Sequence, residues 1–253
     1  MYINTTGLVL RETAYKESSK ILTVLTGREG KLTVTAHGAV RRNSKLAAST
    51  QLLAFSEMTL YSRRDRWTLT EARSAEQFIG LRDDLVLLSL GAYFAELTEA
   101  VADEDSPSAV LLPLCLNALY ALSEKLKPPE LLKPAFELRL MATTGFEPLL
   151  ESCDSCRLSD IERAFLDLSG GTIRCGNCIG KTADSSLHAV LGKGALSAAR
   201  YVVSCDAKKL FSFAISKTSL REFSKAAEAY MLAHLDRRFR TLDFYKEIAT
   251  TGK

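Results

Sequence analysis

The first 79 residues alternate between apolar and polar positions with a period of two. Residues 31–36, Lys-Leu-Thr-Val-Thr-Ala, show the alternation most clearly, and this period is typical of a strand with one buried face. Four further short segments are rich in β-forming residues, at positions 7–10, 21–25, 58–62 and 67–71. About five strands without a long helical pattern favour a small closed barrel, and a five-stranded OB-type barrel is the most economical choice.

The pattern changes at about residue 80. Residues 85–101 are apolar on nearly every side, which predicts a largely buried helix, with Asp84 supplying favourable charge at its start. Ser106 and Pro107 have the residue types of an N-cap and a first helical position, and they predict a second helix that runs to about residue 127. Pro113 within this segment implies either a kink or a later start of the helix.

The remainder of the chain also has a mainly helical pattern. A helix around Phe136 is expected to end at Gly145, a residue suited to a left-handed cap. Residues 187–203 predict another helix, and Ser219 opens a further one as the first residue of a capping box. The predicted fold class is α+β, with an OB-fold domain over 1–79 and a helical domain over 80–253.

Composition and charge narrow the class of protein. The chain is 47% hydrophobic and 25% charged, with a net charge of +3. Its charge is segregated: residues 1–80 hold 12 Lys and Arg against 7 Asp and Glu, residues 81–152 hold 5 against 12, and residues 153–253 hold 16 against 11. Basic ends around an acidic middle suggest separate partners for these parts, and a basic part is a candidate surface for a polyanion.

Several classes of protein are excluded by what the sequence lacks. No apolar run approaches the roughly 20 residues of a membrane-spanning helix, so no membrane partner is expected. The first residues do not resemble a signal peptide, which predicts a reducing, cytoplasmic location. Phosphate-binding loops, nucleophile elbows and histidine-rich metal motifs are absent, so no catalytic residue is assigned and the protein is not expected to be an enzyme.

Two C-x-x-C pairs form the most specific motif of the chain. Cys153 and Cys156 make the first pair, Cys175 and Cys178 make the second, and 18 residues separate the pairs. This is the spacing of a zinc ribbon, in which two tight turns converge on a tetrahedral ion. Disulfides and a redox pair are the alternatives, and a reducing compartment disfavours disulfides. We expect one structural Zn²⁺ per chain, in a module over 150–182 inserted into the helical domain.

The cations of the first 80 residues gather in connections between strands. One group follows the third predicted strand and the other surrounds a hairpin tip; together they are Arg41, Arg42, Lys45, Arg63, Arg64 and Arg66. Such loops release counterions from phosphates, and neighbouring aromatic rings can stack bases. Tyr61 and Trp67 are the candidate rings, although a lone Trp at a strand start is more often a core residue.

A second cationic group lies near the end of the chain, at Arg237, Arg238 and Arg240. It is a candidate for a second DNA contact. Cations at the C-terminus of a helix also stabilise that helix through its dipole, so both explanations stay open.

The sequence resembles the RecO family of bacterial recombination and repair proteins over essentially its whole length. The resemblance rests on segments in a consistent order: residues 7–11 and 15–26, Gly38-Ala-Val-Arg-Arg42, Phe136-Glu-Leu-Arg-Leu-Met-Ala-Thr-Thr-Gly-Phe-Glu-Pro148 leading into the cysteine pairs, and the region from His234. It implies an N-terminal OB barrel, a C-terminal helical domain and an inserted zinc element.

The resemblance also implies a function. Members of the family bind single- and double-stranded DNA, anneal complementary strands and, with RecR, help to load RecA onto DNA coated by single-strand-binding protein. The apolar helices of the acidic middle could offer a groove to the C-terminal tail of single-strand-binding protein or to another partner. The residues expected to line that groove are Lys133, Phe136, Arg139 and Leu140. The alternative function is a zinc-ribbon adaptor between proteins, such as a transcription-associated factor.

Overall fold

The structure is a computed structural model that describes residues 1–64, 66–104, 106–180 and 187–251. The chain forms two compact units: unit 1 contains Met1–Leu126 and Phe239–Lys253, and unit 2 contains Lys127–Arg238. Unit 1 therefore combines a barrel with three helices from two separate parts of the chain. The predicted ends of the domains, at residues 79 and 80, stay a prediction. Residues 252 and 253 of the predicted helical domain lie outside the described residues.

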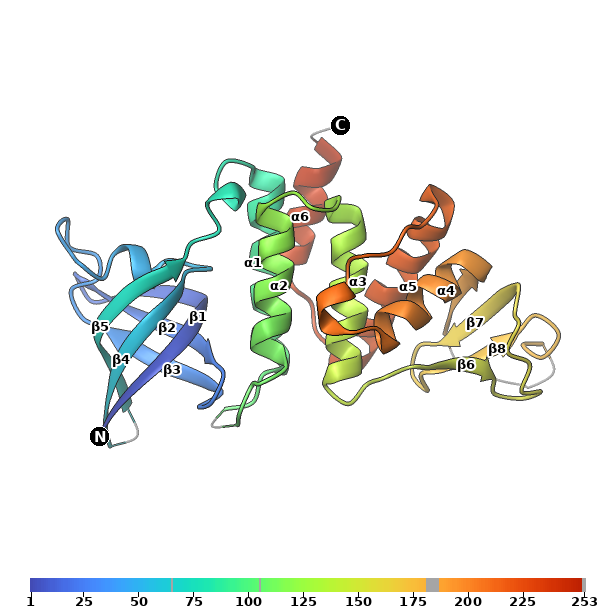
Figure 1. Ribbon diagram of the computed structural model, residues 1–253, viewed down its shortest axis with the longest axis horizontal. Helices are drawn as coiled ribbons and strands as arrows, with labels where there is room; N and C mark the ends of the chain where they lie inside the picture. Colours follow the sequence, from blue (N-terminus) through green and yellow to red (C-terminus); the bar gives the residue numbers. More distant parts are fainter. Residues whose placement is uncertain (65, 105, 181–186, 252–253) are drawn as a thin grey trace. The chain divides into compact units, whose positions relative to one another are not determined.

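The barrel of unit 1 is built from five strands, as predicted. They are β1 (Tyr2–Tyr15), β2 (Ser19–Thr26), β3 (Lys31–Ala36), β4 (Phe55–Arg63) and β5 (Arg66–Glu76). The strands close in the order β1-β2-β3-β5-β4, shown in Figure 1. All neighbours are antiparallel except β3 and β5. The expectation of an OB-type barrel followed by helices is confirmed.

Side chains of the strands alternate between the interior of the barrel and its outer face. The inward side chains form one apolar core that includes Leu22, Val24, Val34, Met58 and Leu60, each at most 2% exposed. Successive residues of a strand point to opposite faces of the sheet. The odd-numbered residues of β4 from 57 to 61 therefore point away from the core.

Unit 1 also contains α1 (Leu85–Val101), α2 (Leu111–Ser123) and α6 (Arg240–Thr251), with short 3₁₀ turns at Ala48–Thr50 and Ile79–Leu81. The first helix has the predicted bounds. The Asp84 carboxylate caps it by accepting hydrogen bonds from the backbone N–H of Val86 at 2.9 Å and of Leu87 at 3.2 Å.

Helix α2 has the later of the two predicted starts. It begins at Leu111 and not at Pro107, because the preceding segment is bound to the barrel. Glu104 forms bridges with Gly30 and Lys31, and the Ser108 N–H donates to the Gly27 carbonyl at 3.2 Å. A segment that pairs with strand residues has an extended backbone and cannot start a helix. Asp105, in the same predicted break, lies outside the described residues.

The described residues of unit 2 form three helices and a four-stranded sheet. The helices are α3 (Pro129–Thr143), α4 (Lys193–Ser204) and α5 (Lys217–Leu235), with a 3₁₀ turn at Ala207–Lys209. The strands are β6 (Leu149–Cys153), β7 (Arg163–Asp167), β8 (Thr172–Cys175) and β9 (His188–Gly192), in the order β6-β8-β7-β9.

The predicted end of α3 is confirmed. Gly145 has a left-handed backbone with φ of +92°. The Phe146 N–H donates to the Met141 carbonyl at 3.0 Å, which is the six-residue hydrogen bond of a Schellman cap.

The helix predicted over 187–203 was wrong in its first part. Residues 188–192 form β9, whose Val190 and Leu191 pair with Phe165 and Ala164 of β7. A short apolar run fits a strand as well as a helix, and here an available edge of the sheet decides between them.

The capping residue of α5 also differs from the prediction. Its N-cap is Ser216, whose hydroxyl accepts from the Ser219 N–H at 3.2 Å. Ser219 therefore lies in the first turn and does not cap the helix.

We searched the described part of the chain for membrane-spanning helices, and no helix there has both the length and the apolar character that a membrane span requires.

Candidate nucleic-acid interface and metal centre

The connection after β3 presents three of the predicted DNA-binding cations. Arg41, Arg42 and Lys45 are all exposed. Backbone hydrogen bonds fold this connection into consecutive turns: the Arg41 N–H donates to the Gly38 carbonyl at 3.2 Å, and the Ser44 N–H donates to the Arg41 carbonyl at 2.9 Å. The three cations therefore lie on an ordered loop.

Apolar contacts and a hydrogen bond anchor this loop to the barrel. Ala39 is 2% exposed in the core and Leu46 packs against that core, so the loop is held on both sides of its cations. The Val40 N–H also donates to the Ser18 carbonyl in the turn between β1 and β2, at 3.1 Å. The loop therefore lies beside the β1–β2 turn.

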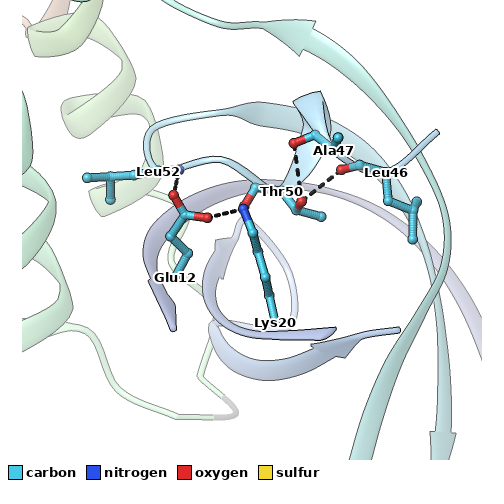
Figure 2. A network of polar contacts seen from close by, with 6 residues as sticks. All are labelled: Glu12, Lys20, Leu46, Ala47, Thr50 and Leu52. Carbon is cyan, nitrogen blue, oxygen red and sulfur yellow. Dashed lines mark hydrogen bonds and ion pairs between the residues drawn. The ribbon is translucent and has the colours of Figure 1, made fainter. Parts of the chain in front are cut away.

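A polar network fixes the chain that follows the loop, and Figure 2 shows it from close by. The Glu12 carboxylate pairs with the Lys20 ammonium and accepts from the Leu52 N–H at 3.3 Å. The Lys20 ammonium also donates to the Thr50 carbonyl at 3.5 Å, and the Thr50 hydroxyl donates to the Leu46 carbonyl at 2.7 Å. The end of the cationic connection is thus tied to β1 and β2.

The hairpin between β4 and β5 carries the second predicted group of cations. Arg63 of β4 lies opposite Arg66 of β5 in the strand register. The side chains of Arg63, Arg64 and Arg66 are all exposed. Arg64 has a left-handed backbone with φ of 52°, as expected of a tight connection. Asp65, which belongs to the predicted tip, lies outside the described residues.

Neither group of cations is neutralised by an acidic side chain among the described residues. Within that part of the chain, no carboxylate forms an ion pair with Arg41, Arg42, Lys45, or the three arginines of the hairpin. Exposed cations of this kind keep their counterions in water and can exchange them for phosphates.

The two candidate aromatic rings are placed differently. Trp67 is half-buried and packs against the barrel core, a placement that fits the alternative of a structural role. Tyr61 points away from the core and lies against Tyr2, with ring centroids 4.8 Å apart. Sequence reasoning did not single out Tyr2, because only the pairing of β1 with β4 brings it to Tyr61.

One face of the barrel is partly covered by an acidic side chain of α1. The Glu99 carboxylate pairs with Arg11 at 2.9 Å and accepts from the Thr23 hydroxyl at 3.4 Å, and its backbone carbonyl accepts from the Lys31 ammonium at 3.2 Å. These partners lie on β1, β2 and β3. The pair with Glu99 neutralises the charge of Arg11, so this arginine is less available to a phosphate than an unpaired cation.

The C-terminal arginines do not all lie at the end of one helix. Helix α5 ends at Leu235, and Arg237 and Arg238 follow it, whereas Arg240 is the first residue of α6. All three side chains are exposed. A cation at a helix N-terminus is not favoured by the dipole, so the structural explanation does not apply to Arg240. DNA binding by this group stays a prediction.

The predicted partner-binding residues of α3 lie mainly inside unit 2. Phe136 and Leu140 have no exposed surface. The Arg139 guanidinium donates to the backbone carbonyls of Val202, at 3.0 Å, and Cys205, at 2.9 Å, at the end of α4. These three side chains hold helices together, and a partner could not reach Phe136 or Leu140 in this conformation.

The fourth of these residues, Lys133, is the centre of a buried ion-pair group. Its ammonium lies 2.8 Å from a carboxylate oxygen of Glu137 and 2.8 Å from one of Glu228. Burial lowers the pKa of Lys133, but the two carboxylates outweigh that effect and raise it above its usual value. The ammonium therefore stays charged at neutral pH and joins α3 to α5.

The four cysteines of the C-x-x-C pairs converge on one point of unit 2. Their sulfur atoms all lie within 4.8 Å of one another, and the group is the one cluster of possible metal ligands among the described residues. The antiparallel strands β7 and β8 lie between the two pairs in the sequence and form a hairpin that brings the two cysteine turns together. The four thiols could hold a metal ion.

Backbone hydrogen bonds shape both cysteine turns and favour a thiolate at Cys153, whereas side-chain hydrogen bonds with Cys175 and Cys156 raise the pKa of Cys178 to about 12. The Arg157 N–H donates to the Cys153 carbonyl at 2.9 Å, and the Cys178 N–H donates to the Cys175 carbonyl at 3.0 Å. Burial raises the pKa of the Cys153 thiol, but N–H groups of Cys156 and Cys175, among others, outweigh burial and lower it to about 6. A thiolate is the form that binds a metal.

Comparison with known proteins agrees with these features. Residues 1–78 match the family described as Recombination protein O N terminal, and residues 82–243 match the family described as Recombination protein O C terminal. The chain is 32% identical over 248 residues to the DNA repair protein RecO of Acetivibrio thermocellus, covering 98% of this chain and 97% of that protein. It is 32% identical over 250 residues to the DNA repair protein RecO of Alkaliphilus metalliredigens, covering 98% of this chain and 100% of that protein. The resemblance seen in the sequence is confirmed, and the chain belongs to the RecO family of DNA repair proteins.

Proposed function

We propose that this protein binds single- and double-stranded DNA through the cationic connections of its barrel and anneals complementary strands during recombinational repair. With RecR, it would help to load RecA onto DNA coated by single-strand-binding protein. Its partners are accordingly DNA, RecR and the C-terminal tail of single-strand-binding protein, and its place of action is the cytoplasm, at the nucleoid.

The observation that carries this proposal is the ordered loop with Arg41, Arg42 and Lys45. Its cations are exposed and without a carboxylate partner among the described residues, and the network of Figure 2 holds the chain behind them. A surface of this kind gains free energy from counterion release when phosphates replace the counterions. A loop that is already ordered loses little conformational entropy on binding.

Annealing follows from such a surface without a catalytic step. Two strands must approach each other with their charge neutralised and their bases free to pair. Cations on the β3–β4 connection and on the β4–β5 hairpin can bind the backbone of a strand and leave its base edges exposed. The C-terminal Arg237, Arg238 and Arg240 would supply a further contact. The proposed function therefore requires no nucleotide hydrolysis.

For the cysteine cluster we propose one structural Zn²⁺ per chain. A tetrahedral zinc site with Zn–S bonds of about 2.3 Å has S–S edges of about 3.8 Å, and the sulfur atoms of Cys156 and Cys175 are 3.8 Å apart. Four thiolates fill the coordination shell, so the ion would stabilise the fold of the β6–β8 region and would not activate water. Residues 181 and 182 of the predicted zinc module lie outside the described residues.

A strand-annealing assay tests the proposed function. Purified protein is mixed with two complementary labelled oligonucleotides in the absence of nucleotide and divalent cations, and duplex formation is followed by energy transfer. We expect annealing well above the spontaneous rate, with a loss of the effect as salt is raised, because phosphate contacts are screened.

A direct binding measurement distinguishes this function from the alternative of a zinc-ribbon adaptor. A labelled single-stranded oligonucleotide is titrated with the protein at about 0.1 M salt. Binding clearly tighter than the ~10⁻⁴ M limit of non-specific contacts supports the DNA-binding function. Absence of binding at that concentration, together with no acceleration of annealing, would favour the adaptor.

A further inference from the structure

We propose that Tyr2 and Tyr61 form a base-stacking platform for single-stranded DNA at the end of the barrel that carries the β4–β5 hairpin. The inference rests on the proposed DNA-binding function and names a second contact beyond the cationic loops. The site lies on the outer face of β1 and β4. Of its two rings, only Tyr61 was a candidate from the sequence.

The strand register fixes the direction of both rings. Tyr2 pairs with Tyr61 across β1 and β4, and the next pair along the strands is Ile3 with Leu60. Leu60 is fully buried in the barrel core and Ile3 packs against it. Because side chains alternate between faces, Tyr2 and Tyr61 point outward.

The geometry of the two rings leaves aromatic surface available. Their centroids are 4.8 Å apart and their planes meet at 40°, so they contact each other in a tilted arrangement. Tyr2 is 67% exposed and Tyr61 is half-buried. A cross-strand aromatic pair stabilises a sheet by itself, but an exposure of 67% leaves most of the Tyr2 ring in water, where a base can cover it.

Positive charge surrounds the pair. The N-terminal ammonium of Met1 donates to the Ser62 carbonyl at 3.1 Å, next to Tyr61. Arg63 is two residues beyond Tyr61 on the same strand, and Arg64 and Arg66 follow in the hairpin, all exposed. An aromatic face for bases beside cations for phosphates is the combination that binds single-stranded nucleic acid.

A groove continues from the platform along the same face of the barrel. It has a volume of about 780 Å³ and begins at Asn4 and Thr59, the next outward pair after Tyr2 and Tyr61. The Thr59 hydroxyl donates to the Asn4 side-chain carbonyl at 3.0 Å. Two cations, Arg28 and Arg73, and two carboxylates, Glu57 and Glu71, also line the groove. Their charges balance, so the groove offers hydrogen-bonding groups, without net positive charge, to a strand that leaves the platform.

The test compares two oligonucleotides with equal charge. One is a 15-residue oligothymidylate and the other is an abasic strand with the same number of phosphates. Replacing Tyr61→Ala or Tyr2→Ala should weaken oligothymidylate binding roughly ten-fold, since stacking on one aromatic contributes a factor of about 5 to 150. Binding of the abasic strand and the salt dependence should not change, because no phosphate contact is lost.

Matched variants separate stacking from other effects. Tyr61→Phe and Tyr2→Phe keep the rings and should bind oligothymidylate as the unmodified protein does. Tyr120→Ala removes a tyrosine that is 53% exposed on α2 and should have no effect. Circular dichroism of each variant checks that the barrel is folded.

Four results would overturn the platform. Unchanged oligothymidylate binding by both alanine variants would show that neither ring stacks on a base. An equal loss of binding to the abasic strand would show that the loss is not due to stacking, and equal losses for alanine and phenylalanine variants would assign it to the hydroxyl groups. If the unmodified protein binds neither strand, the proposed function itself fails, and the platform fails with it.

Discussion

Replacing Cys153 with serine is expected to abolish metal binding by the cysteine cluster and to unfold the β6–β8 region of unit 2. Cys153 is fully buried at the end of β6, and its sulfur accepts a hydrogen bond from the Cys175 N–H at 3.4 Å. A small metal module obtains much of its folding free energy from the ion, an apparent ~10–16 kcal/mol in zinc-finger peptides, so loss of a buried ligand is expected to destabilise this region strongly.

Elemental analysis of protein purified without chelators measures this effect. The unmodified protein should contain one zinc per chain and Cys153→Ser close to none, with loss of strand signal in circular dichroism and rapid proteolysis near residue 160. Cys156→Ser removes an exposed ligand and serves if Cys153→Ser is insoluble. Cys205→Ser lies outside the cluster and should retain the zinc. An unmodified protein without zinc would contradict the proposed metal.

Replacing Lys133 with methionine is expected to destabilise unit 2 by about 3–5 kcal/mol. The substitution keeps the apolar volume but removes the ammonium that lies between Glu137, which has no exposed surface, and Glu228. Two carboxylates then face each other without that positive charge in a region of low dielectric. Their repulsion lowers the free energy of unfolding by more than burial of the methionine side chain raises it. Urea denaturation at pH 7 with saturating zinc measures the change in the unfolding free energy.

An exposed ion pair of the same unit provides the control. The Lys193 ammonium lies 3.1 Å from Asp160 and 2.6 Å from Glu162, with 57% of its side chain exposed. Because water screens such pairs, Lys193→Met should leave the free energy of unfolding nearly unchanged. Equal losses for Lys133→Met and Lys193→Met would contradict the structural role assigned to Lys133.

The barrel could be predicted because its signal is local. Alternation over 31–36 and over the neighbouring segments gives both the strands and their buried faces, and the buried side chains of the core, such as Val34 and Leu60, follow that phase. The cysteine cluster could be predicted for a related reason, since two residues between ligands place both thiols on one turn.

Elements that depend on distant partners could not be predicted in the same way. Residues 188–192 are a short apolar run with no strand-specific pattern, and they form β9 because the edge of β7 is available. The start of α2 is delayed because Glu104 and Ser108 bind the turn between β2 and β3. The residues of neither segment indicate which distant residues it will contact.

The candidate sites show the same limit. The sequence placed Phe136 and Leu140 on a groove for a partner, since an apolar helix face does not reveal what covers it, and in the structure both are buried. Tyr2 was missed for the opposite reason, because a tyrosine near the chain start has no signal until β1 pairs with β4. The exposed cations were found readily, because charge in a short connection predicts exposure.

The salt dependence of single-strand binding tests the central claim most directly. The unmodified protein is compared with a variant in which Arg41, Arg42 and Lys45 are all alanine, and with a control in which Lys208, Lys209 and Lys217, also exposed cations, are alanine. Both variants lose three charges. We expect the loop variant to bind more weakly, with a plot of log affinity against log salt that is shallower by about 2, since each phosphate contact contributes a slope of about 0.7. Affinity and slope equal to those of the unmodified protein, or an equal change in the control, would contradict the assignment of DNA binding to this loop.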